Sequence, residues 1–212
     1  MAYPVVKDFS SALLIAASGS VVSCQTPSAA ELAEFVAKSK RHIEVTSLRP
    51  NHEADKWSLS REHGLREFPF HTDGAHLREP PDLVALHCVN SGNATASTRF
   101  LSVDALRLSG AEIFALEHDI YVATGGRGTF LFSILSEGRM RYDPHCMKLM
   151  SPGGKSAQIM SLAIGRADLI EHHWKRGETL IWSNSRLLHG RSTVVGFETT
   201  NIRTLTRYSI WL

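Results

Sequence analysis

Short apolar runs, broken at close intervals by glycine, proline and asparagine, make up most of the second half of the chain. The runs are rich in β-branched and aromatic residues, which are typical of strands rather than helices. We therefore predict strands over residues 42–48, 83–89, 98–103, 120–124, 129–135, 139–143, 179–182, 187–189 and 203–212.

Helical signals are fewer and lie between these strands. Ser28 and Glu31 form a capping box, which predicts a helix that runs to about Lys40. Asp104 can cap a further short helix. Apolar residues at helical spacing, ending at Ile170, indicate one amphipathic helix. The predicted helices cover residues 28–40, 104–110, 111–118 and 155–170.

Many short strands with few helices describe a barrel or a sandwich of sheets. A length of 212 residues is sufficient for one domain with its own core. No internal repeat or low-complexity tract divides the sequence, so we expect a single domain over residues 1–212. The glycine-rich stretch 125–128 lacks the strand-to-helix context of a phosphate-binding loop, and a tight hairpin is the better interpretation.

Composition and charge narrow the classes of function. Hydrophobic residues make up 43% and charged residues 21% of the chain, as in ordinary globular proteins. The formal net charge of +2, without any block rich in lysine and arginine, gives no reason to expect nucleic acid or a membrane surface as a partner. We expect a small molecule as the partner, and the sequence leaves open whether the protein forms a homo-oligomer.

The cysteines favour a reducing compartment. Cys24, Cys88 and Cys146 are too few and too scattered for a disulfide framework, and none forms a CxxC pair. We therefore expect a cytoplasmic protein. The apolar run 11–17 and the segment ending at Cys24 resemble a lipoprotein export signal, but the run is short and Asp8 spoils a basic leader, so we do not favour export.

Two segments far apart in the chain carry the candidate chemistry. In the stretch FPFHTDGAH, His71 and Asp73 are two residues apart, so both side chains leave the same face of an extended strand. More than a hundred residues later, an apolar run delivers His189 just before a glycine turn. Two histidines and one carboxylate on a β framework form the ligand set of non-haem Fe(II) oxygenases, which leaves one side of the metal open.

With the motifs around these residues, the sequence resembles the Fe(II)/2-oxoglutarate-dependent dioxygenases of the taurine dioxygenase and clavaminate synthase type. The resemblance extends from about Pro69 to Trp211, roughly two thirds of the chain. It implies a mainly β fold with flanking helices, the double-stranded β-helix or jelly roll of clavaminate synthase-like proteins. The segments that carry it are FPFHTDGAH, PPDLVALHCVN, TRFLSVDAL, RYDPHCM, GETLIWSNSRLLHGRS and IRTLTRYSIW.

The resemblance also implies roles for individual residues. His71, Asp73 and His189 match the three iron ligands of the family. Arg203 follows the second histidine at the spacing of the arginine that binds the far carboxylate of 2-oxoglutarate, and Thr98 matches a threonine that assists it. A planar, permanently charged guanidinium suits such a carboxylate better than a lysine does.

Two further arginines are candidates for binding the substrate. Arg207 lies four residues after Arg203, so the two point to the same side of a strand. No acidic residue follows Arg207, and the nearest in sequence, Glu198, lies across the preceding turn. We therefore expect an anionic group of the substrate to balance the charge of Arg207. Arg191 could pair with the carboxylate of either the substrate or 2-oxoglutarate.

A polar stretch over residues 51–64 predicts a loop across the mouth of the site. Its larger side chains are either substrate contacts or ordinary solvated residues, and the sequence leaves both interpretations open. They are His52, Lys56, Trp57 and Arg61.

These expectations combine into an oxygenase that uses Fe(II), 2-oxoglutarate and O2, and that hydroxylates a small anionic or amino-acid-like molecule with release of succinate and CO2. Two alternatives stay open. A cupin-like metal enzyme would not use 2-oxoglutarate, would need no arginine for it, and more often has three histidine ligands. A non-catalytic binding module on the same barrel is the other.

Overall fold

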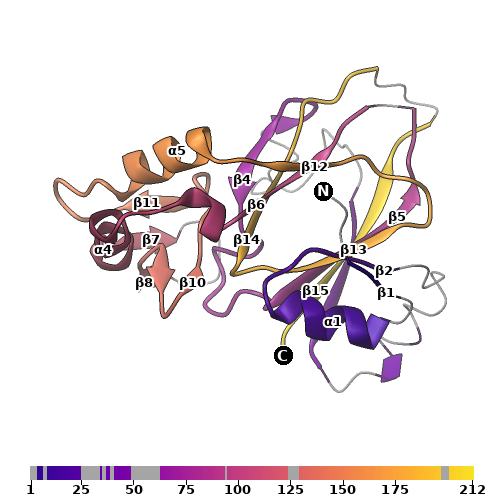
Figure 1. Cartoon of the computed structure of the whole chain (residues 1–212), viewed down its shortest axis with the longest axis horizontal. Coiled ribbons are helices and arrows are strands. Elements are labelled where there is room, and N and C mark those ends of the chain that lie inside the picture. The colour runs from indigo at the N-terminus through magenta and orange to yellow at the C-terminus, as the bar shows by residue number, and fades with distance from the viewer. Residues whose placement is uncertain are drawn as a thin grey trace.

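The computed structural model describes residues 4–6, 9–24, 34, 37–38, 41–48, 63–93, 95–123, 129–196 and 201–212. Over these ranges the chain is mainly β, with few short helices (Figure 1). None of the helices in them is long and apolar enough to cross a bilayer. Most of the helix expected over 28–40, nearly all of the loop expected over 51–64, including its four candidate contacts, and the glycine stretch 125–128 lie outside the described residues.

The larger sheet has six strands and carries one helix on its outer face. Helix α1 (Phe9–Ala17) packs against this sheet through Ala12, Leu13 and Ala16. The first two strands run parallel, and every other neighbouring pair is antiparallel. In spatial order the strands are β1 (Val5–Val6), β2 (Val22–Cys24), β13 (Thr179–Ser183), β5 (Leu83–Asn90), β15 (Thr204–Ile210) and β3 (Ile43–Leu48).

The second sheet has four antiparallel strands and lies in the middle of the molecule (Figure 1). Its strands come from distant parts of the chain, so their alignment depends on tertiary pairing rather than on hairpins. In spatial order they are β12 (Ile170–His172), β6 (Thr98–Ser102), β14 (Leu187–Arg191) and β4 (Phe68–His71).

A third layer covers the face of the four-stranded sheet that points away from the six-stranded one (Figure 1). It contains helices α4 (Gly110–His118) and α5 (Ser156–Arg166) and the 3-10 helix η1 (Asp104–Leu106). It also contains two small antiparallel sheets, made of β11 (Met147–Leu149), β7 (Tyr121–Ala123) and β8 (Leu131–Phe132), and of β10 (Arg139–Met140) and β9 (Leu135–Ser136).

The period-2 alternation of the strands divides their side chains between opposite cores. On β14, Leu187 lies in the core between the two large sheets, whereas Leu188 lies in the core beneath α4 and α5. His189 has the parity of Leu187, and its ring centroid lies 5.1 Å from that of Trp182 on β13. The alternation therefore points His189 into the space between the sheets.

The expected strands are present, most of them with ends shifted by one or two residues, and the range 129–135 is divided between β8 and β9. The expectation of one helix over 155–170 was wrong at its end. Helix α5 stops at Arg166, and Ile170 begins β12, where it pairs with Phe100 and packs on the inter-sheet core. Packing on a different core overrides the helical spacing of this residue.

The helix caps also differ from expectation. Asp104 does not cap η1, because the N-cap position is Val103 and has no side-chain hydrogen bond. The helix expected over 111–118 is α4, and Ser109 and Glu112 form a capping box at its start that the sequence analysis missed. The apolar run 11–17, which resembles part of an export signal, lies in helix α1 against the six-stranded sheet, and Cys24 is buried in β2 of that sheet.

Gly190 lies where β14 passes closest to β4, at a register shift in their pairing. A β-carbon there would lie 2.8 Å from the carbonyl oxygen of Phe68, which is backbone and cannot swing aside. We expect Gly190→Ala to lower the free energy of unfolding by about 1–3 kcal/mol in urea denaturation. Gly110→Ala is the matched control, because no atom lies within 4 Å of its β-carbon and alanine favours a helix. Equal losses in the two variants would contradict this explanation.

Candidate metal centre

His71 and His189 face each other directly across two paired strands. They are register partners in the antiparallel pair of β4 and β14, so their side chains leave the same face of the sheet. Their ring centroids are 4.4 Å apart, and both residues are buried. The strand pairing alone therefore brings together two imidazoles that are 118 residues apart in sequence.

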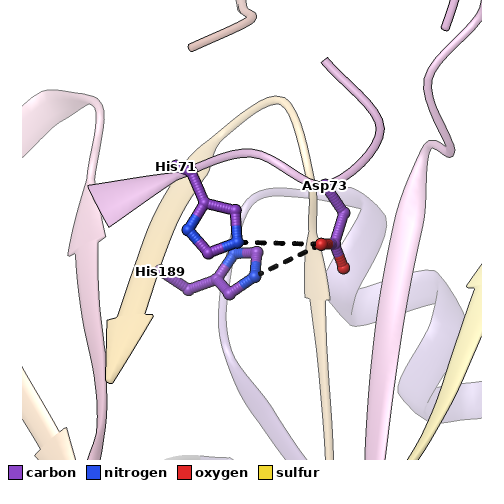
Figure 2. A group of neighbouring side chains, drawn as sticks. All are labelled: His71, Asp73 and His189. Atoms are coloured by element: carbon purple, nitrogen blue, oxygen red, sulfur yellow. Dashed lines mark ion pairs between the residues drawn. The ribbon is translucent and has the colours of Figure 1, made fainter. Parts of the chain in front are cut away.

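Asp73 completes the group from the turn that follows β4 (Figure 2). Its Oδ1 lies 3.8 Å from Nε2 of His71 and 3.8 Å from Nε2 of His189. One ligand atom from each of the three residues lies within 4.8 Å of the others, and no second group of this kind occurs among the described residues. Asp73 was expected on the strand itself, but β4 ends at His71.

The hydrogen bonds and charges around the three side chains suit a metal. His71 Nδ1 donates to the carbonyl oxygen of Pro69 at 2.9 Å, which leaves Nε2 as the ring nitrogen that faces the centre. Burial, together with His71 and Arg207, lowers the pKa of His189 to about 3, and its ring is neutral at physiological pH. Burial acts to raise the pKa of Asp73, but the charge and the hydrogen bond of Arg207 act against it, and this pKa lies below its ordinary value.

Asn184, in the turn between β13 and β14, holds the backbone of Asp73. Its Oδ1 accepts from the Asp73 amide at 2.8 Å, and its Nδ2 donates to the carbonyl oxygens of Asp73 and Pro81 at 2.8 and 2.9 Å. This role was not predicted from the sequence, although a polar residue between two apolar runs is a signal for it. Thr72 is held as well, since its amide donates to the carbonyl oxygen of Tyr142 at 2.7 Å.

Arg203 and Thr98 meet at one short segment near the start of β6. Arg203 Nη1 donates to the carbonyl oxygen of Ala96 at 2.6 Å, and the Arg203 side chain is buried. Thr98 is also buried, and its hydroxyl oxygen accepts from Trp174 Nε1 at 2.8 Å. Arg203 therefore bonds to a residue two positions before Thr98, the other residue expected to bind 2-oxoglutarate.

Arg191 has partners other than the carboxylates considered for it. It lies opposite Thr98 in the strand pairing, and its Nη2 donates to the carbonyl oxygens of Gly64 and Arg66, both at 2.6 Å. Its guanidinium carbon lies 3.8 Å from the ring centroid of Phe68. Burial and the charge of Arg203 lower the pKa of Arg191 to about 10, which leaves it charged at neutral pH. Arg191 thus holds the chain that leads into β4.

Arg207 is paired with a carboxylate of the protein. Its Nη1 lies 3.0 Å from Oδ1 of Asp73. The expectation that no acidic residue balances Arg207 was wrong, because the partner lies 134 residues away in sequence and sequence neighbours do not reveal it. A register shift between Thr204 and Leu205, in the pairing of β15 with β5, lies between Arg203 and Arg207. The spacing of four residues therefore does not by itself place both arginines on one face of the sheet.

The three ligand candidates fit a divalent metal of the iron type. The donor set is two imidazole nitrogens and one carboxylate, the arrangement of mononuclear non-haem Fe(II) sites. The second carboxylate oxygen, Asp73 Oδ2, is buried without a hydrogen-bond partner in the part of the chain that is described, and so is Nδ1 of His189. A buried carboxylate oxygen without a partner costs free energy, and a metal bound to the carboxylate of Asp73 would offset that cost.

We expect Asn184→Ala to weaken metal binding by about 10- to 100-fold, the usual effect of removing a group that holds a ligand in place. Calorimetric titration with Co(II) measures the affinity. Ser151→Ala is the control: it removes a side-chain acceptor of a backbone amide, that of Ile120, in the layer of α4 and α5, far from the metal centre. An unchanged affinity in Asn184→Ala would show that Asp73 holds its position without this residue.

No family model matches the sequence, and no curated protein matches it either. Solved structures do match. An asparagine oxygenase in complex with Fe(II), hydroxyasparagine and succinate superposes with a TM-score of 0.65 and 18% identity, over 79% of this chain and 56% of that one. The non-haem iron oxygenase OrfP, in complex with Fe and alpha-ketoglutaric acid, has a TM-score of 0.61 and 19% identity, over 79% and 56%.

The PvcB protein from Pseudomonas aeruginosa matches a larger share of both chains, 90% of this one and 75% of its own, with a TM-score of 0.64 and 17% identity. By contrast, this chain spans little more than half the length of the asparagine oxygenase and OrfP. At such identities the similarity establishes the fold. The resemblance expected from the sequence is confirmed at that level: the chain has the fold of these non-haem iron oxygenases.

Proposed function

We propose that the protein is an Fe(II)- and 2-oxoglutarate-dependent oxygenase that hydroxylates a small anionic or amino-acid-like molecule and releases succinate and CO2. The observation that carries this proposal is the buried group of His71, Asp73 and His189, with its ligand atoms within 4.8 Å. A neutral imidazole at His189 and an ionised carboxylate at Asp73 are the forms that bind a metal.

The same proposal covers the architecture. We take the six-stranded and four-stranded sheets, with the ligand candidates between them, as the two sheets of a double-stranded β-helix in a single domain. In that fold the strands that hold a metal must come from distant parts of the chain, as β4 and β14 do.

Each part of the site has a role in this proposal. His71, Asp73 and His189 hold the iron, which with 2-oxoglutarate and O2 supplies the oxidising chemistry when bound. Arg203, assisted by Thr98, binds the far carboxylate of 2-oxoglutarate. The support is charge: no ion pair within the described ranges includes Arg203 or Arg191, although both are buried. Two buried cations without a counter-ion favour a ligand that brings a carboxylate.

The substrate in this proposal docks its anionic group on Arg207. About a third of this side chain is exposed, at 31%, and among the described residues only its Nη1 forms a hydrogen bond, so donors remain for another anion. The asparagine oxygenase and OrfP hold hydroxyasparagine and hydroxy-arginine, and a free amino acid carries such a carboxylate. Arg191 is the second candidate for this role.

A cytoplasmic location stays a prediction.

The two alternatives make different demands on the site. A cupin-like enzyme that does not use 2-oxoglutarate leaves the buried charge of Arg203 unexplained. A non-catalytic module needs no neutral His189 imidazole beside an ionised carboxylate. An anaerobic spectrum separates the proposed function from both alternatives, because Fe(II) with 2-oxoglutarate absorbs weakly in the visible range only when both bind at one centre.

We expect His71→Ala, Asp73→Ala and His189→Ala each to abolish this absorption and substrate-stimulated formation of succinate, while the chain stays folded. Three ligands are the minimum for an open facial site, so the loss of one releases the metal. His118→Ala is the control, because this histidine lies on the surface of α4 and its contacts among the described residues are with Phe114 of the same helix. Turnover retained in any two of the three variants would remove the metal assignment.

We expect Arg203→Lys to weaken 2-oxoglutarate binding by about tenfold or more with Fe(II) affinity unchanged, because lysine keeps the charge but loses the planar fork. Titration of the Fe(II) protein with 2-oxoglutarate, followed by the visible absorption, measures this. Arg107→Lys serves as the control, since the Arg107 side chain is 81% exposed. An unchanged 2-oxoglutarate affinity would assign the carboxylate to Arg207 or Arg191.

A further inference from the structure

Arg207 binds the same carboxylate oxygen that faces both imidazoles. Its Nη1 lies 3.0 Å from Asp73 Oδ1, and that oxygen lies 3.8 Å from Nε2 of His71 and of His189. The other oxygen of Asp73 is buried and makes no hydrogen bond in the described part of the chain. The oxygen best placed to bind a metal is therefore also the one that a cation of the protein already holds.

We propose that Arg207 competes with the metal for Asp73: it neutralises this carboxylate in the metal-free protein, weakens metal binding, and releases the carboxylate when an external anion takes its guanidinium. The inference rests on the proposed function, because it requires that the three residues bind a metal. It assigns Arg207 a second partner beyond the substrate and links the two.

Electrostatics sets the direction of the effect. A guanidinium that contacts Asp73 Oδ1 lies within a few ångströms of any metal bound to that oxygen, and like charges at this range repel strongly in a buried site. The hydrogen bond also withdraws electron density from the ligand atom. Both effects lower the affinity for a divalent cation, so removing the guanidinium raises it.

Arg207 is the partner that can move. Asp73 is fixed through its backbone, because Asn184 binds both its amide and its carbonyl group. The Arg207 side chain lies partly in solvent, with 31% exposed against 9% for that of Asp73. An anion that enters from solvent therefore meets Arg207 first, and a guanidinium shared with that anion binds Asp73 less tightly.

The test is a titration of the metal-free protein with Co(II) alone, at about pH 8, where an ordinary histidine is neutral. Visible absorption and calorimetry both report the affinity. We expect Arg207→Gln to bind Co(II) about tenfold more tightly than the wild type, and Arg207→Lys, which keeps a cation, to stay within about threefold of the wild type.

A second readout is thermal unfolding. Metal-free Arg207→Gln should unfold at a lower temperature than the wild type, because Asp73 loses its counter-ion, and saturating Co(II) should raise its Tm by more. Arg203→Gln is the matched control: it removes another cation near the site, but one whose hydrogen bond goes to Ala96 rather than to Asp73. Its Co(II) affinity should change less than that of Arg207→Gln.

The outcomes separate the inference from the function on which it rests. A wild-type protein that does not bind Co(II) would overturn both. Weaker or unchanged Co(II) binding in Arg207→Gln, with a normal wild type, would overturn this inference alone and make Arg207 a residue that only positions Asp73. Arg207→Lys behaving like Arg207→Gln would overturn it too, since charge would not be the cause.

Discussion

The direct pairing of His71 with His189 across β4 and β14 is the constraint on which the rest of the site depends. Side chains alternate along a strand, so a slip of one residue would turn one imidazole from the inter-sheet space toward the core beneath α4 and α5. Gly190 permits the register, because the backbone of β4 comes too close there for a β-carbon. Strand register therefore sets the positions of His71 and His189 in the candidate metal centre, and the turn after β4 adds Asp73 to them.

The charge of the site is the second constraint. Three arginines lie around the inter-sheet space, and Arg207 alone among them forms an ion pair within the described ranges, with Asp73. Arg191 binds backbone carbonyl groups, and Arg203 binds one such group. Carbonyl oxygens satisfy hydrogen bonds but do not neutralise a cation, so this group of arginines keeps a positive surplus. A ligand with carboxylates complements this surplus, which is why the arginines and the metal ligands support one proposal.

The third constraint is the rigidity of the turn that carries Asp73. A carboxylate outside a strand could adopt several orientations, and each would cost binding free energy when a metal orders it. Asn184 restrains the backbone of this turn through three hydrogen bonds, two to Asp73 and one to Pro81, and Thr72 adds a link to Tyr142. The candidate metal centre therefore combines two residues held by strand pairing with a third whose backbone is held by a side chain of the opposite turn.

The sequence alone determined the mainly β character and most strand positions, because these follow from local alternation. It also indicated the candidate ligands: His71 and Asp73 through their close spacing, and His189 through the apolar run that ends in it. It could not determine the end of α5, since Ile170 fits a helical stripe and only the inter-sheet core shows which surface it packs on. The tertiary structure also decided the partners of Asn184, Arg191 and Arg207. Each partner lies more than a hundred residues away, and periodicity contains no information on contacts at that separation.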